Sequence, residues 1–310
     1  MGNVVGCDIS KDWFDAQITG SDHRRLRIDN KAKAIDAFAR ELAPGSLVGM
    51  EATGQMHELL AEKLVKRGHT VFVINPRWIR LYARGLGIRG KTDRTDAALI
   101  ARFVTAEGGN LHAYEPPSRQ HKELRKLVLR RKKLVELKVA TRQSLGAEAR
   151  SLITQFNTLI KRIEQRIAEI MQSIPDWQRL AERLRTEPGV GKIVAAHLVE
   201  TFTRMPFKNA DAFIAHTGLD PRPNDSGQKR GRRHLTHHGD ALLRSMLFMA
   251  AMKAAQRGYW QEVYQLHRRK GLASTAALVV VARKLARVAF SLFRSGATYD
   301  ESRLTAARNP

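Results

Sequence analysis

The sequence lacks the features that define several large classes of protein. Its 310 residues contain a single cysteine, Cys7, which excludes an internal disulfide framework and a cysteine-ligated zinc finger and favours a reducing compartment. No apolar run reaches the roughly 18 residues that a membrane span needs, and the longest one stops at Arg283. Asp8 and Asp12 stand where a secretory signal would be basic and then apolar. We therefore expect a soluble, intracellular protein.

Aromatic residues are also scarce, at 6% of the chain. The tryptophans are too scattered to predict one platform on which bases could stack, so we expect core or interface positions for Trp13, Trp78, Trp177 and Trp260. Cys7 lies beside Asp8 in an apolar run and is expected to be an inert, buried side chain.

Acidic residues are few relative to basic ones. The chain has 30 Asp and Glu against 54 Lys and Arg, a formal net charge of +24, which predicts a polyanionic partner. Hydrophobic residues make up 43% of the sequence, so a wholly disordered basic tail is excluded. The length predicts about two domains. Together these properties indicate a folded protein that handles nucleic acid.

The first third of the chain alternates β-branched runs with amphipathic stretches, which is typical of an α/β layer. We predict strands over Asn3–Ile9, Trp13–Thr19, Arg24–Asp29, Ser46–Met50 and Thr70–Ile74. We predict helices over Lys31–Leu42, Gln55–Arg67, Pro76–Arg84 and Asp93–Thr105.

The middle of the chain predicts a long helix or a helical pair. Residues 118–173 contain no proline, and apolar residues recur every three or four positions from Leu145 to Ile174. This apolar seam predicts an oligomer interface, or a contact made by folding back within one chain. The preceding helix, Arg119–Arg142, is basic enough to line a nucleic-acid backbone, above all at Arg130, Arg131, Lys132 and Lys133.

Carboxylates at the ends of predicted elements are the informative residues in so basic a protein. Asp8 lies near the end of the first strand and Glu51 follows the fourth, so the two side chains emerge at one edge if these strands are neighbours. Asp93 and Asp96 are spaced i, i+3 and share one face of a helix. Four such carboxylates suit divalent ions, which stabilise the attacking and leaving oxygens in phosphodiester chemistry. Taken singly, each acid also fits a turn, a helix cap or a solvated position.

Two loops in the last third suit contact with phosphate. Residues 188–191, Pro-Gly-Val-Gly, lie between two amphipathic stretches, as in a helix-hairpin-helix. There Gly189, Gly191 and Lys192 would bind the phosphate backbone of a nucleic acid without recognising its sequence. The same four residues also form an ordinary turn. We expect further helices over Asp240–Arg257 and Ala273–Arg294.

The second loop, residues 219–239, is rich in Pro, Gly, Arg and His. It places Ser226 beside a run of cations that would neutralise charge on a phosphate under attack: Lys229, Arg230, Arg232 and Arg233. The alternative is a flexible basic loop that contacts phosphate without chemistry. The nearby histidines complete no familiar zinc spacing and suit phosphate contacts or the start of the next helix: His234, His237 and His238.

Three acidic motifs carry a family resemblance. Residues 6–11 (GCDISK), 50–54 (MEATG) and 91–97 (KTDRTDA) resemble those of the DEDD insertion-sequence transposases, the "one-ten" family guided by a bridge RNA. Residues 219–221 and 225–227, with the basic run that follows, are similar to the C-terminal transposase domain of this family. The resemblance covers almost the whole chain.

The resemblance implies a RuvC-like, ribonuclease H-fold domain in which Mg2+ is held by Asp8, Glu51, Asp93 and Asp96. It implies that Ser226 is the catalytic nucleophile and meets the carboxylates of another subunit. We therefore predict a RuvC-like domain over 1–115, a helical coiled-coil segment over 116–175 and a mostly α-helical transposase domain over 176–310. The expected partners are DNA, a structured non-coding RNA and further copies of the chain, as a dimer assembling to a tetramer. The expected location is the prokaryotic cytoplasm, at the nucleoid.

Other functions fit parts of this pattern. A junction-resolving nuclease of the RuvC type would need the carboxylates but not the serine. A non-catalytic nucleic-acid-binding protein would be explained by charge alone and would be indifferent to Mg2+. A sugar-kinase-like ATPase also begins with a Gly-x-Asp strand, but the chain lacks a P-loop.

Overall fold

The computed structural model describes residues 3–20, 23–52, 54, 56–88, 93–222, 225–226, 229–230 and 234–306. The side chains of residues 93–95, 222, 225–226, 229–230 and 305–306 lie outside the description. The chain forms two compact units, Met1–Pro116 and Pro117–Pro310. Each unit has its own apolar core.

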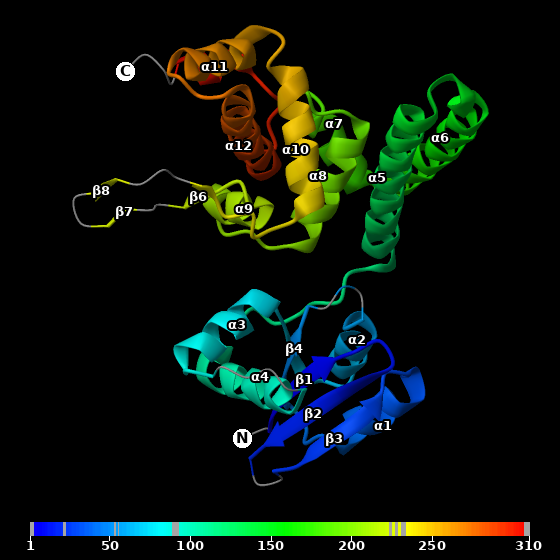
Figure 1. Ribbon diagram of the computed structural model, residues 1–310, viewed down its shortest axis with the longest axis vertical. Helices are drawn as coiled ribbons and strands as arrows, with labels where there is room; N and C mark the ends of the chain where they lie inside the picture. The colour runs from blue at the N-terminus through cyan, green and yellow to red at the C-terminus, as the bar shows by residue number, and fades with distance from the viewer. Residues whose placement is uncertain are drawn as a thin grey trace. The chain divides into compact units, whose positions relative to one another are not determined.

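The first unit is built on a mixed five-stranded sheet (Figure 1). Its strand order is β3-β2-β1-β4-β5, with β1 and β2 antiparallel, β2 and β3 antiparallel, and β1, β4 and β5 parallel. The strands are β1 (Val4–Ile9), β2 (Trp13–Thr19), β3 (Arg25–Asp29), β4 (Leu47–Glu51) and β5 (Thr70–Ile74). The predicted α/β layer is confirmed, and each predicted strand is present within a residue or two.

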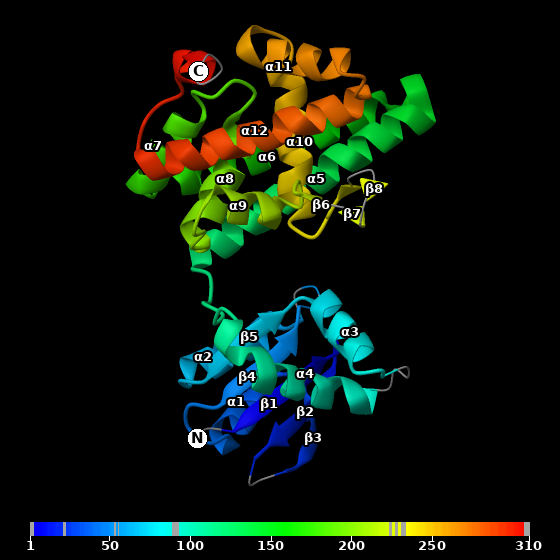
Figure 2. The same cartoon turned by 90° about the vertical axis from the view of Figure 1, so that its left-hand side faces the viewer.

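Helices cover both faces of this sheet: α1 (Ala32–Glu41), α2 (Glu58–Lys66), α3 (Pro76–Gly85) and α4 (Asp93–Glu107), followed by the short helix η1 (Gly108–Asn110). Side chains alternate between the faces along each strand. Val5, Cys7 and Met50 join the core that contains residues of α1 and α2, whereas Phe72 and Ile74 join the core formed with α3 and α4. Figure 2 shows α4 crossing the strands.

Two glycines let α4 approach the sheet closely. A Cβ atom at Gly6 would lie 2.1 Å from the Ala97 carbonyl oxygen, and one at Gly49 would lie 2.4 Å from a methyl carbon of Val104. A side chain at Gly6 would therefore clash with the α4 backbone, and one at Gly49 would clash with the Val104 side chain of α4. Cys7 points to the other face and is fully buried; burial raises the pKa of its thiol, so the thiol stays protonated, as an inert core residue would.

The second unit begins with a helical hairpin in which α5 (Arg119–Leu145) and α6 (Arg150–Gln172) lie side by side (Figure 1). They are joined by the short helix η2 (Gly146–Ala149), where Gly146 has a φ of +53°. The predicted apolar seam therefore packs at least in part within one chain. Several large apolar side chains of the hairpin remain exposed: Leu129, Leu137, Val139, Leu145, Leu152 and Leu159.

The rest of this unit is mostly helical: α7 (Pro175–Leu184), α8 (Lys192–Arg204), α9 (Ala210–Thr217), α10 (Ala241–Ala254), α11 (Gly258–Arg269), α12 (Ser274–Ser295) and α13 (Glu301–Ala306). Trp177 and Trp260 are buried in its core, as predicted. Trp13 and Trp78 of the first unit are instead 40% and 53% exposed. No helix in the described part of the chain is long and apolar enough to cross a membrane.

Candidate functional site

Two predicted carboxylates lie side by side at the carboxyl edge of the sheet. The parallel register pairs Cys7 with Met50, so the next residues along β1 and β4 are Asp8 and Glu51. Cys7 and Met50 are fully buried on the face of α1 and α2. Strand alternation directs the two carboxylates to the opposite face, the one that α4 covers.

The N-terminal end of α4 lies over this edge. Its Ala97 backbone contacts Gly6, two residues before Asp8, and Asp96 directly precedes Ala97. Asp93 is the first residue of α4, but its side chain lies outside the described residues. The backbone thus gathers the acidic motifs at one end of the sheet. Among the described residues, no three or more His, Cys, Asp or Glu side chains lie close enough together to hold a metal ion.

Asn30, which the sequence did not single out, connects the loops that follow the two acidic strands. Its Nδ2 donates hydrogen bonds to the Ser10 carbonyl oxygen, at 3.1 Å, and to the Met56 carbonyl oxygen, at 3.3 Å. Its backbone N–H also donates to the Asp12 carbonyl oxygen, at 2.8 Å. Asn30 therefore connects the loop after β1 to the segment just before α2.

Replacing Asn30 by alanine should loosen this edge. We expect Asn30→Ala to lose about 1–2 kcal/mol of stability, because two backbone carbonyl groups lose their donor. Amide hydrogen exchange should rise in residues 9–13 and around Met56. Asn110→Ala is the control, since its exposed side chain donates to nearby Glu107, three residues away. Equal exchange in the two variants would contradict the positioning function of Asn30.

Asp15 of β2 is a carboxylate that the sequence motifs did not point to. It lies directly opposite Asp8 in the antiparallel register but is only 4% exposed. The Arg27 guanidinium donates to both of its oxygens, at 3.1 and 2.8 Å, and Arg25 lies 3.5 Å away. Hydrogen bonds from Arg27 hold the pKa of Asp15 below its usual range. Asp15 is thus an ion-paired structural group.

Ser226 lies in an extended loop between α9 and α10. The strand β7 (Asp225–Ser226) pairs with β8 (Lys229–Arg230), and β6 (Pro221–Arg222) pairs with β9 (His234–Leu235). Figure 1 shows β7 and β8 projecting away from α9. The predicted cations Arg232 and Arg233 lie outside the described residues, as do the side chains of Ser226, Lys229 and Arg230.

The base of this loop is held firmly. The Thr236 hydroxyl donates to the Asp220 carboxylate, and the Asp240 backbone N–H donates to the His216 carbonyl oxygen at 2.8 Å. A Cβ atom at Gly239 would lie 2.0 Å from the same carbonyl oxygen, so only glycine fits there. The ends of the loop are fixed to the helical core, and its serine-bearing part extends from that base.

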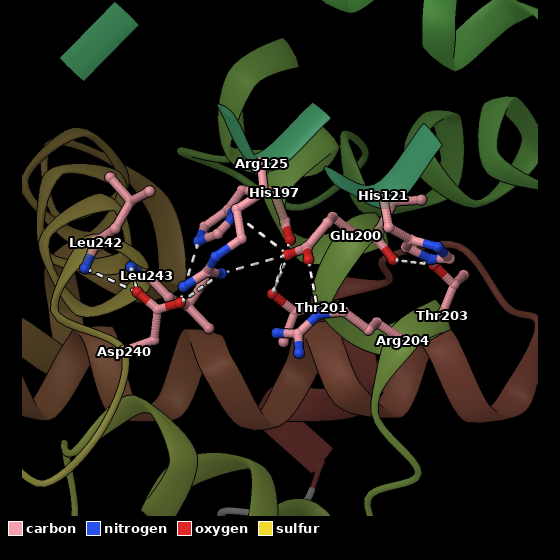
Figure 3. Close-up of polar contacts among 11 residues, drawn as sticks. His121, Arg125, His197, Glu200, Thr201, Thr203, Arg204, Asp240, Leu242 and Leu243 are labelled. Carbon is pink, nitrogen blue, oxygen red and sulfur yellow. Dashed lines mark hydrogen bonds and ion pairs between the residues drawn. The ribbon is translucent and has the colours of Figure 1, made fainter. Parts of the chain in front are cut away.

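A buried network of charges lies beneath the loop base (Figure 3). Asp240 caps α10 by accepting from the backbone N–H groups of Leu242 and Leu243, at 2.9 and 3.0 Å. Arg125 of α5 donates to the other Asp240 oxygen at 3.0 Å and lies 3.7 Å from Glu200. Burial opposes ionisation of Asp240, but the charge of Arg125, the His197 ring and the hydrogen bonds from Arg125 and the Leu243 N–H together outweigh it and lower the pKa of Asp240 to about 2.

Two further side chains complete this network. Arg204 donates to Glu200 at 2.7 Å. The fully buried His197 has its ring nitrogens 3.7 Å from a Glu200 oxygen and 3.8 Å from an Asp240 oxygen. Burial lowers the pKa of His197, so the ring is neutral at pH 7. The network joins the basic helix α5 to α8 and to the loop base at Asp240.

The predicted phosphate-binding turn joins α7 to α8. A Cβ atom at Gly189 would lie 2.2 Å from the Ala250 carbonyl oxygen, so packing against α10 already requires glycine at this position. Gly191 and Lys192 are exposed at the start of α8, where backbone N–H groups favour an anion. On α5, Arg130 and Lys133 are exposed, whereas Arg131 is paired with Glu164 of α6 at 2.6 Å.

Sequence comparisons identify the class of this protein. Residues 5–170 match the profile of the DEDD transposases of IS110 elements, and residues 181–265 match a profile described as "Transposase IS116/IS110/IS902 family". Both matches define a transposase. Since the first of them spans more than half of the sequence, the chain belongs to the IS110 family of insertion-sequence transposases. This family suggests a divalent metal requirement.

Individual relatives are similar over nearly their whole length. The chain is 29% identical over 316 residues to the pilin gene-inverting protein of Moraxella lacunata, covering 96% of this chain and 97% of the relative. It is 26% identical to a probable family 20 transposase of Pseudomonas aeruginosa, covering 95% and 98%. It is 24% identical to the transposase for insertion sequence element IS1328 of Yersinia enterocolitica, covering 97% and 100%.

Proposed function

We propose that this transposase cuts and rejoins DNA strands with two sets of groups, a carboxylate cluster and a serine nucleophile. The cluster comprises Asp8, Glu51, Asp93 and Asp96, and the nucleophile is Ser226. The observation that carries the proposal is the parallel register that sets Asp8 beside Glu51 under the N-terminal end of α4.

The carboxylates suit Mg2+ as ligands, because hard cations prefer carboxylate oxygens and water. When bound, Mg2+ would stabilise charge on the attacking and leaving oxygens of the scissile phosphate. Asp15, directly opposite Asp8, is already paired with Arg27. We therefore do not include it among the metal ligands. We further propose that the α/β unit has a RuvC-like fold; its mixed sheet, with the acids at one edge, supports this.

The serine step would proceed as follows. The Ser226 oxygen attacks the phosphorus, a new oxygen–phosphorus bond forms, and the bond from phosphorus to a sugar oxygen breaks. The serine hydroxyl gives up its proton, the sugar oxygen gains one and leaves as a free hydroxyl, and the DNA stays linked to serine. Attack by the hydroxyl of another strand reverses the step and rejoins the DNA. Cations of the loop would neutralise the developing charge.

Partners follow from the same proposal. The exposed Arg130 and Lys133 of α5 suit phosphate contacts. The exposed Gly191 and Lys192 at the start of α8 suit them too, and this turn supports a helix-hairpin-helix at α7 and α8. A structured non-coding RNA is the proposed guide, and a discrete RNA should co-purify with the protein from its host. The exposed apolar side chains of the α5–α6 hairpin support assembly into a dimer and then a tetramer.

The test is to trap the covalent intermediate. Purified full-length protein, RNA transcribed from beside its gene and Mg2+ are incubated with labelled DNA that spans the element junction, and protein-linked DNA is resolved on a denaturing gel. Ser226→Ala should abolish the adduct and rejoining while DNA binding persists. Ser151→Ala, which changes an exposed serine of α6, is the matched control and should behave as wild type.

Other outcomes would favour the alternatives. Free cleaved ends that survive Ser226→Ala would make the protein a metal-dependent nuclease of the RuvC type, with the serine loop as a binding element. DNA binding without cleavage, and without any response to Mg2+, would make it a non-catalytic binding protein. Recombination at the wild-type rate in Ser226→Ala would overturn the nucleophile assignment.

A further inference from the structure

Helix α3 carries an exposed aromatic and apolar row on its outer face. Trp78 is 53% exposed and Leu81 is 49% exposed. The inner face is anchored, since Ile79 is buried and Tyr82 packs edge-on against Phe103 of α4, with ring centroids 5.2 Å apart. Helix α3 is therefore held against the core of the unit by its inner face, and Trp78 lies on its exposed outer face.

A basic row runs beside this apolar row. At 100° per residue, Arg77, Arg80 and Arg84 fall on an arc adjacent to that of Trp78 and Leu81, and Arg80 and Arg84 are exposed. The Arg80 Nε donates to the Pro76 carbonyl oxygen at 3.3 Å, along its own helix. The ten residues of α3 contain no acidic side chain.

The position of α3 relates this face to the candidate site. Helix α3 starts directly after β5 and is capped by the Asn75 side chain, which accepts from the Arg77 backbone N–H at 2.9 Å. The last residue of β5, Ile74, pairs with Glu51, and its carbonyl oxygen accepts from the Ala52 N–H at 2.9 Å. The helix thus begins at the sheet edge where Glu51 ends β4.

Charge decides which partner suits this face. A second copy of a chain with a net charge of +24 would bring more positive charge to a face with no acid of its own. A nucleic-acid strand supplies phosphates for the arginines and flat bases for the indole. A duplex keeps its bases stacked inside, so only unpaired nucleotides can stack on Trp78. Trp13 differs, because the Arg27 guanidinium already lies 5.3 Å from its ring centroid.

We propose that the outer face of α3 binds unpaired nucleotides, with Trp78 stacked on a base and Arg80 and Arg84 paired with backbone phosphates. This face would hold an opened strand beside the carboxylate edge. The inference deepens the proposed function and rests on it for the identity of the strand. Single-stranded DNA and RNA both offer bases that can stack on Trp78 and phosphates that can pair with the arginines. The experiment below distinguishes the two.

Binding of short oligonucleotides to full-length protein without Mg2+ tests the proposal. The probes are labelled oligo-dT, oligo-U and a duplex of equal length, at fixed low salt. Trp78→Ala should weaken single-strand binding about tenfold and leave duplex binding nearly unchanged, and Trp78→Phe should retain most of the affinity. Met252→Ala, which removes an exposed apolar side chain on α10, is the control. A larger loss with oligo-dT identifies DNA as the strand, and a larger loss with oligo-U identifies RNA.

Fluorescence gives a direct second measurement. In a Trp13→Phe background, Trp78 is the one exposed tryptophan, because Trp177 and Trp260 are 5% and 1% exposed. Single strands should quench its emission. Unchanged single-strand affinity in Trp78→Ala, an equal loss on duplex, or a change of oligomeric state without loss of affinity would each overturn the proposal. Neither readout needs catalysis, so a negative result leaves the carboxylate and serine chemistry untouched, and a missing covalent adduct leaves the stacking result untouched.

Discussion

Glu51→Gln should lower Mg2+-dependent DNA cleavage by at least about a hundredfold, the scale seen when one preorganised electrostatic group is removed from an active site. Glutamine has nearly the same shape as glutamate, so β4 and its register should be retained. The amide carries no negative charge and is a weak ligand for a hard cation. Cleavage rates across a Mg2+ titration, together with calorimetric Mg2+ binding, measure the effect.

Two controls accompany this variant. Glu41→Gln removes a carboxylate that is 56% exposed and lies 3.5 Å from Arg24, and it should cleave DNA as wild type does. Circular dichroism should show an unchanged fold for both proteins. Normal cleavage and normal Mg2+ binding by Glu51→Gln would mean that the edge of the sheet is not the metal site.

Arg125→Met should strongly destabilise the second unit. It leaves the buried Asp240 without its cationic partner, and we expect a loss of about 3 kcal/mol. This is the lower end of the range for breaking a buried pair, because the Arg125 side chain is itself 38% exposed. Arg130→Met on the same helix removes an exposed arginine and should change stability by less than about 0.5 kcal/mol. Thermal and denaturant unfolding compare the two variants.

The pH dependence should reverse in this variant. In the wild type the folded pKa of Asp240 is about 2, below the ordinary value of 3.8, so its contribution to stability is present above the ordinary value and is lost as the pH falls toward the folded one. Without Arg125, burial dominates and raises the pKa, so acid should then stabilise the folded state. Asp240→Asn in the Arg125→Met background should recover much of the loss. No recovery would show that the arginine acts through packing alone.

The fold of the first unit follows closely from local sequence patterns. Short β-branched runs between amphipathic stretches identified the strands, and the turn residues Asn75 and Pro76 marked the end of β5. The α5–α6 hairpin was predicted only as one long helix or a pair, because the apolar repeat is the same for both and the change of direction depends on Gly146, where φ is +53°.

The site was predictable only where a short motif carries it. Asp8 and Glu51 stand out because they end strands in a basic chain. Asn30 has no such signal, since its two acceptors lie 20 and 26 residues away. Arg125 and Asp240 are 115 residues apart in the chain, and periodicity gives no information about such a pairing. The exposure of Trp78 likewise depends on which face α3 turns toward α4.

The glycines beneath α4 have a consequence for the chemistry. Gly6 has no side chain, so the α4 backbone packs almost directly on β1, and Gly49 leaves room on β4 for the side chains of Ile100 and Val104. In the proposed mechanism, the distance between α4 and the sheet determines how far Asp93 and Asp96 lie from Asp8 and Glu51. The two glycines would thereby set the distance between the carboxylates of α4 and those of the sheet. This distance limits the size of the cation that the four carboxylates can bind together.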